Sequence, residues 1–233
     1  MPLKRTFREN WLTRKPLRNG VWATILLVLL LAFGKLAEYP ASADLVYGKG
    51  EIWRAWTTLF VHADPGHLLA NVFLFAPFAY ALITAYGYFL FPVVGFFVGG
   101  LVNLVVLKTM PAATTLVGAS GVVYWMGAAW ITLAFLVDRR DRMTVRLLKA
   151  FGVSMLLFLP DKYRPEVSYL THGLGYLAGV ISALVYYAMK RSEFRRAERY
   201  DYRYDFEAHW DPRTNRYSAE LIPDEIEAAN AEN

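Results

Sequence analysis

The feature that most constrains this chain is a run of 40 residues, 68–107, without one charged or histidine side chain. A membrane-spanning helix needs about 20 predominantly apolar residues. The run is therefore long enough for two crossings, and Tyr86-Gly87 interrupts it near its middle. Hydrophobic residues make up 56% of the 233, which is rare in a soluble domain of this size. The sequence predicts an all-α polytopic membrane protein.

The apolar segments predict six transmembrane helices, at about 21–38, 66–85, 88–107, 119–137, 145–160 and 169–189. The fifth is the least apolar, and it crosses only if Lys149 extends its amine to the interface. The basic N-terminal stretch resembles the start of a signal peptide. Because no small-residue cleavage site follows the first apolar segment, we expect that helix to be retained.

Lysine and arginine are unevenly distributed, which tests this count. Nineteen of the 25 lie in residues 1–20, 139–149 and 190–233. With six crossings all three segments lie on one side of the membrane, as the positive-inside rule requires. We therefore expect both termini in the cytoplasm. A bacterial inner membrane is the default location, since the N-terminal segment lacks the serine-rich character of a transit peptide.

The same pattern divides the chain into a basic cytoplasmic segment (1–20), a six-helix membrane domain (21–189) and a polar cytoplasmic tail (190–233). The tail starts basic and ends acidic, which predicts a solvated region with one short helix. Its arginine cluster is either ordinary topogenic charge or a contact with anionic lipid. We expect no nucleic-acid partner.

Four polar side chains fall at a similar depth near the outer ends of predicted helices that run inward. Ser120 lies in the first turns of the fourth helix, and His172 lies near the start of the sixth. His67 and Asn71 lie near the start of the second. Ionisable groups within membrane spans are costly, so these residues are candidates for a functional site.

The stretch Gly118-Ala119-Ser120-Gly121 has two interpretations. Small residues let membrane helices approach closely, and the GxxxG pair Gly175 and Gly179 by itself indicates the same. Alternatively, the serine is a nucleophile. His172 lies three and seven residues before the two glycines, so one stripe of the sixth helix can pack closely and also present an imidazole.

A serine–histidine pair is the minimal activated nucleophile, in which histidine takes the hydroxyl proton and returns it to the leaving group. Tyr124 follows Ser120 by four residues, so its ring can stack against an imidazole beside the same helix face. His67 and Asn71 are also four apart and can donate together to an oxyanion, beside the Ser120 N–H.

A metal centre is the competing interpretation of the histidines. The chain has no HExxH motif, no cysteine and no membrane carboxylate beside these histidines, so we expect no metal. Asp64 is predicted to cap the second helix.

Together these elements resemble the rhomboid family of intramembrane serine proteases, over residues 20–190. Four elements occur in the family's order: Trp53-Arg54; His62 and His67 with Asn71; Gly118-Ala119-Ser120-Gly121 with Tyr124; and His172-x-x-Gly175-x-x-x-Gly179. The resemblance implies that Ser120 is the nucleophile and His172 its base. It further implies an oxyanion hole of His67, Asn71 and the Ser120 N–H, with Tyr124 supporting His172. Trp53 and Arg54 would belong to the first outer loop, and His62 would support the site without a chemical role.

The implied function is hydrolysis of single-pass or multi-pass membrane proteins near their outer ends, in contact with membrane lipid and without any cofactor. The oligomeric state is left open. A catalytically silent client-binding relative is the main alternative, but such a protein is expected to have lost the serine or the histidine. A small transporter would need mid-membrane charges or broken helices in repeated halves, and neither is evident. Asn103 is predicted to bond to a neighbouring helix.

Overall fold

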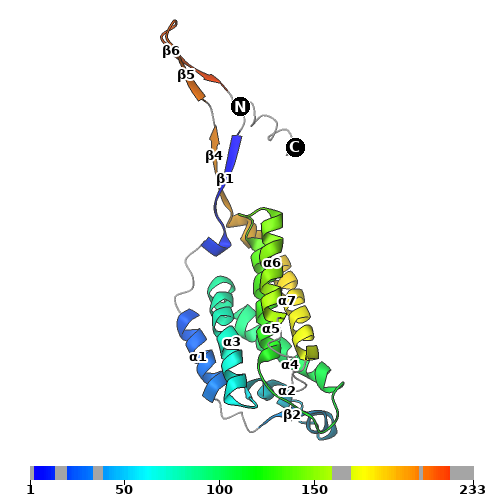
Figure 1. Ribbon diagram of the computed structural model, residues 1–233. Helices are drawn as coiled ribbons and strands as arrows, with labels where there is room; N and C mark the ends of the chain where they lie inside the picture. Colours follow the sequence, from blue (N-terminus) through cyan, green and yellow to red (C-terminus); the bar gives the residue numbers. More distant parts are fainter. Residues whose placement is uncertain (1–2, 14–19, 34–38, 159–168, 205–206, 221–233) are drawn as a thin grey trace.

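The computed structural model describes residues 3–13, 20–33, 39–158, 169–204 and 207–220. Six principal helices pack side by side (Figure 1) and lie where the sequence predicts them. They are α1 (Gly20–Phe33), α3 (Pro65–Tyr86), α4 (Gly95–Leu107), α5 (Ser120–Val137), α6 (Met143–Phe158) and α7 (Tyr169–Arg196). The all-α architecture of the membrane domain is confirmed.

Four of the described helical segments are long and apolar enough to cross a membrane: α3, Phe89–Leu107, α5 and α7. The second of these joins the single turn η5 (Phe89–Val94) to α4, with non-helical torsions at Phe91. The apolar helix at Gly20–Ala32 is shorter, and α6 has 16 residues. Residues 34–38 and 159–160 of the predicted first and fifth spans lie outside the described residues. The six crossings therefore stay a prediction.

Helix α5 is the centre of the bundle and packs most closely on α7. A Cβ on Gly175 would overlap the carbonyl oxygen of Gly121, and one on Gly179 would overlap that of Trp125. The Trp125 indole N–H donates to the Ser182 hydroxyl at 3.1 Å, again between α5 and α7. The predicted close packing through the GxxxG pair is confirmed, with the glycine-flanked start of α5 as its partner.

The loop before α3 folds over one end of the bundle, which we call the site end. It contains η3 (Asp44–Gly48), α2 (Arg54–Thr57) and η4 (Thr58–Phe60). Strand β2 (Ala41–Ser42) pairs antiparallel with β3 (Thr115–Leu116), which joins this loop to the segment before α5. The Asn103 amide donates to the Ala55 carbonyl at 2.9 Å, so the prediction for Asn103 is confirmed with α2 as the neighbour.

Arg54 organises the same loop. Its guanidinium donates to the Pro40 carbonyl at 3.1 Å and forms an ion pair with Glu51. It also lies 4.8 Å from the centre of the Trp53 ring. The Trp53-Arg54 pair is therefore a structural element of the loop that covers the site end.

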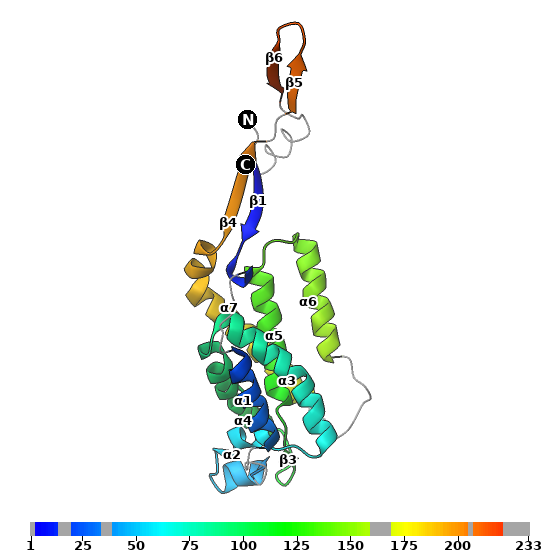
Figure 2. The ribbon, with the colours of Figure 1, turned by 90° about the vertical axis from the view of Figure 1, so that its left-hand side faces the viewer.

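The opposite end, which we call the ribbon end, carries the four remaining described strands. β1 (Leu3–Glu9) pairs antiparallel with β4 (Arg199–Tyr204), and β5 (Glu207–Asp211) with β6 (Arg216–Glu220). Figures 1 and 2 show both pairs extending away from the helices. The short helix η1 (Trp11–Thr13) follows β1 at the end of that strand nearest the helices.

The described part of the tail, 190–204 and 207–220, contains the end of α7 and strands instead of one short helix, and residues 221–233 lie outside the described residues. Helix α7 continues past Lys190 to Arg196, and strands follow it. The alternating aromatic and charged residues of 199–204 suit a strand. Hydropathy does not reveal β4, because its partner strand β1 lies near the other end of the chain.

Candidate active site

The site is built around the first residue of α5, Ser120. Gly118 has φ +107°, a conformation that favours glycine, and this turn leads the chain into the helix. The Gly118 N–H donates to the Thr58 carbonyl at 3.1 Å. Ala119 is fully buried, and its carbonyl accepts the first helical bond from Val123 at 2.9 Å. The serine is therefore held on an anchored backbone.

Thr58 fastens this backbone, and sequence analysis missed it. Its side chain is fully buried, donates to the Leu116 carbonyl and accepts from the Ala41 N–H at 3.3 Å. It thus joins both strands of the β2–β3 pair from a third segment. A threonine in an irregular loop carries no periodic signal, so only the tertiary contacts identify the role of Thr58.

Tyr124 and His172 bring α5 and α7 together at the site. Their rings are stacked, with centroids 4.1 Å apart and planes inclined by 11°. The predicted stacking is confirmed. Ser120 lies one turn before Tyr124 on the same helix, and a Cβ on the next residue, Gly121, would stand 2.8 Å from Thr171 Cγ2. Serine and histidine therefore lie at the same level of two adjacent helices.

A second contact of Tyr124 reaches the fifth predicted helix. Its hydroxyl donates to the Leu157 carbonyl at 2.5 Å, near the end of α6. The edge of the Phe158 ring also packs on the Tyr124 ring, with centroids 5.0 Å apart. The ring that stacks on His172 is thus held from both α5 and α6.

The start of α3 approaches the site from the other side. Asp64 caps this helix, as predicted, by accepting from the His67 N–H at 2.9 Å. The His67 Cε1 and Nε2 atoms lie 2.7 and 2.8 Å from where a Cβ on Gly118 would stand. Asn71 Nδ2 lies 3.8 Å from the same position. Both predicted donors therefore flank the backbone two residues before Ser120.

Asn71 retains a hydrogen-bond donor. Its side chain is buried, and its Nδ2 donates to the His67 carbonyl at 3.0 Å. Because an amide nitrogen carries two hydrogens, one remains for a ligand.

His62 packs against His67, with ring centroids 5.3 Å apart at nearly a right angle. Its Nε2 is buried and has no hydrogen-bond partner among the described residues. Burial, and then the nearby His67, lower the pKa of His62, which favours the neutral imidazole. No group of three or more His, Cys, Asp or Glu residues gathers in the described part of the chain.

The fold defines a polytopic helical membrane protein with a polar cluster at one end of its bundle. A family model for the Rhomboid domain matches residues 49–189, which is more than half of the chain and includes every site residue discussed above. The chain belongs to the rhomboid family. No curated protein matches it. It is an integral membrane protein of a family whose members are usually intramembrane proteases acting on membrane-protein substrates.

Proposed function

We propose that the protein is a serine endopeptidase that cleaves transmembrane substrates, with Ser120 as nucleophile and His172 as general base. The observation that carries this proposal is the stacked Tyr124–His172 pair one helical turn from Ser120. His172 takes the hydroxyl proton as the serine oxygen attacks a peptide carbonyl, and returns it to the departing amine. The same histidine then activates the water that hydrolyses the acyl-enzyme.

The negative oxygen formed in this step needs donors, and we assign them to His67, Asn71 and the Ser120 N–H. Backbone N–H groups in the first turn of a helix have no intrahelical acceptor, and the helix dipole favours negative charge there. His67 and Asn71 contact Gly118, so they approach this first turn from α3. Such donors stabilise an oxyanion best when they are already in place before reaction.

The four glycines of the site support this chemistry sterically. Gly118 permits the turn before Ser120, and Gly121, Gly175 and Gly179 let α7 lie directly against α5. A Cβ at any of the last three would meet the neighbouring helix.

The lysine and arginine distribution orients the proposed site toward the outer face of a bacterial inner membrane, with both termini in the cytoplasm. A substrate helix hides its carbonyls in backbone hydrogen bonds and must unwind locally to be cut. Substrates with glycine or proline near the outer interface are therefore favoured.

The test is labelling of the purified protein with a serine-directed fluorophosphonate. We expect the parent to label, and Ser120→Ala and His172→Ala to stay unlabelled while folded. Ser154→Ala is the matched control, because this membrane serine on α6 donates to the Ala150 carbonyl at 2.8 Å and should be unreactive. Labelling that persists in Ser120→Ala would disprove the nucleophile assignment. A folded parent that never labels would favour the silent client-binding alternative.

Asn71→Ala tests the oxyanion assignment separately. Loss of one oxyanion donor lowers turnover by about 100- to 1000-fold. We expect a decrease of this order in cleavage of a transmembrane peptide, with an unchanged unfolding midpoint. Parental turnover in this variant would remove Asn71 from the oxyanion hole.

A further inference from the structure

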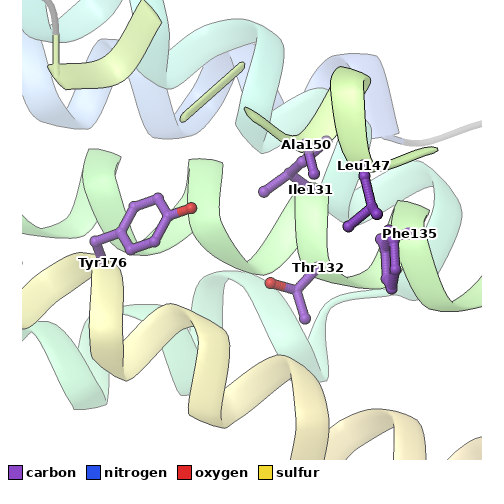
Figure 3. A pocket seen from close by; sticks show the side chains of 6 residues that line it. All are labelled: Ile131, Thr132, Phe135, Leu147, Ala150 and Tyr176. Atoms are coloured by element: carbon purple, nitrogen blue, oxygen red, sulfur yellow. The ribbon is translucent and has the colours of Figure 1, made fainter. Parts of the chain in front are cut away.

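A cavity of about 200 Å³ lies between α5, α6 and α7, and it begins one turn of α7 beyond His172. Ile131 on its wall follows Ser120 by eleven residues, which is about 16 Å along a helix. Figure 3 shows Tyr176 at one end of the cavity and the side chains of Phe135 and Leu147 at the other. The cavity opens to the surface, and its lining is mainly apolar: Ile131, Thr132, Phe135, Leu147, Ala150 and Tyr176.

A guanidinium lies at the Phe135 end of this cavity. Arg146 precedes Leu147 on α6, and its Cζ lies 4.6 Å from the centre of the Phe135 ring. One of its nitrogens donates to the Phe135 carbonyl. Its Nε is buried and has no hydrogen-bond partner within the described residues. The group therefore retains donors that a bound anion would satisfy.

The neighbouring cations differ in whether a carboxylate compensates them. Asp138 pairs with Arg140, Asp141 with Lys149, and Glu198 with Arg139. Among the described residues, Arg142 and Arg146 take part in no ion pair. They lie one turn apart, because the Arg146 N–H donates to the Arg142 carbonyl at 3.1 Å. Arg146 thus borders the open, apolar cavity without an ion-pair partner among the described residues, and a second such cation, Arg142, lies one turn before it in the chain.

We propose that this groove binds an anionic phospholipid, with its phosphate at Arg142 and Arg146 and one acyl chain in the cavity. Guanidinium groups match the geometry of phosphate oxygens. The apolar lining complements a hydrocarbon chain, and the cations lie at the ribbon end, which the charge distribution orients toward the cytoplasm. A headgroup alone would leave the cavity unfilled, and a neutral lipid would leave the cations uncompensated. This proposal does not depend on the reactivity of Ser120.

The lipid would also fill space between α6 and the rest of the bundle. Tyr176 on the cavity wall shares a 2.5 Å hydrogen bond with Ser154 of α6, and it lies one turn beyond His172. Occupancy would therefore stabilise α6 against α7 just below the proposed site.

The experiment is native mass spectrometry of the full chain in detergent, titrated with dioleoyl phosphatidylglycerol or dioleoyl phosphatidylcholine. We expect the parent to retain one phosphatidylglycerol at least tenfold more tightly than phosphatidylcholine. Arg142→Gln combined with Arg146→Gln should abolish this preference. The matched control is Arg191→Gln with Arg195→Gln, which removes two arginines also spaced four apart at the same end of the bundle, and it should keep the preference.

Ala150→Leu tests the acyl chain, because it narrows the cavity and keeps both arginines. It should weaken phosphatidylglycerol binding at least fivefold. If the arginine double variant does not fold, this variant still tests whether the cavity holds an acyl chain. The proposal is overturned if the parent does not prefer phosphatidylglycerol, if the control loses as much as the arginine pair, or if Ala150→Leu binds like the parent.

Discussion

Replacing Gly175 by alanine should force α5 and α7 apart beside the proposed nucleophile. The new Cβ would stand 3.1 Å from the carbonyl carbon of Gly121 and 3.3 Å from its Cα, and would overlap its carbonyl oxygen. Carbon atoms in contact normally lie about 3.5–4.0 Å apart. All three obstructing atoms belong to the backbone of Gly121, so they cannot rotate away. The helices must separate by roughly 0.5–1 Å to restore contact distances of that order.

Overpacking of this kind costs about 1–3 kcal/mol. In a chain of this size each kcal/mol shifts the unfolding midpoint by about 2–4 °C, so we expect a decrease of about 2–12 °C. Activity should suffer more than stability, because Gly121 is the residue after Ser120. A misplacement of about 1 Å lowers catalytic rates by about 100-fold.

The control is Gly173→Ala on the same helix, where an added Cβ meets nothing within 4 Å. Alanine is favoured over glycine in a helix by about 1 kcal/mol, so this variant should be as stable as the parent or more so. Both variants are compared by thermal unfolding, followed by tryptophan fluorescence in one detergent, and by cleavage of a transmembrane peptide. If Gly175→Ala unfolds at or above the temperature of Gly173→Ala and turns over normally, the steric reasoning is refuted.

Three further predictions concern other contacts. Tyr124→Phe keeps the stacked ring and should retain turnover within about threefold. Tyr124→Leu loses a ring contact worth about 0.5–1.5 kcal/mol and should slow peptide cleavage by about 2- to 10-fold. Equal cleavage rates for the parent and Tyr124→Leu would contradict this. Asn103→Leu leaves the buried Ala55 carbonyl without its donor, so denaturant titration should show a loss of about 1–3 kcal/mol rather than none. Hydrogen bonds from Arg140, and secondarily from Asn10, hold the pKa of Asp138 below its usual range. The ionised Asp138 stabilises the fold above its unfolded pKa, and this contribution is lost as pH falls through the lowered folded pKa. The unfolding midpoint of the parent should therefore fall more on acidification than that of Asp138→Asn. Identical pH profiles would show that the Asp138–Arg140 ion pair does not cause the acid sensitivity.

Much of the site was predictable because its residues follow local rules. The i, i+4 spacing of Ser120 and Tyr124 puts them on one helix face. Asp64 before Pro65 is a helix-capping pattern, and the structure bears it out. The small residues of α7 predicted a close neighbour, which proved to be the start of α5.

Other features depend on contacts between segments far apart in sequence. Thr58 binds two strands that neither precede nor follow it directly, and no local pattern marks it. The pairing of β1 with β4 joins the two ends of the chain, so hydropathy and charge predicted only solvated segments there. That Arg142 and Arg146 lack a carboxylate partner also cannot be read from the sequence, because it depends on the nearby carboxylates pairing with other cations: Asp138 with Arg140 and Asp141 with Lys149.

Hydropathy and residue spacing suffice to identify this chain as a membrane protein, to locate its principal helices and to predict which polar residues lie near the same helix ends. These features can be predicted because a hydrocarbon layer imposes strict length and polarity rules on each helix separately. Which helix faces pair depends on steric fit between surfaces and is therefore known from the three-dimensional structure alone: Gly121 packs against Gly175, Tyr124 against His172, and the imidazole of His67 against Gly118. These three contacts bring α3, α5 and α7 together around Ser120.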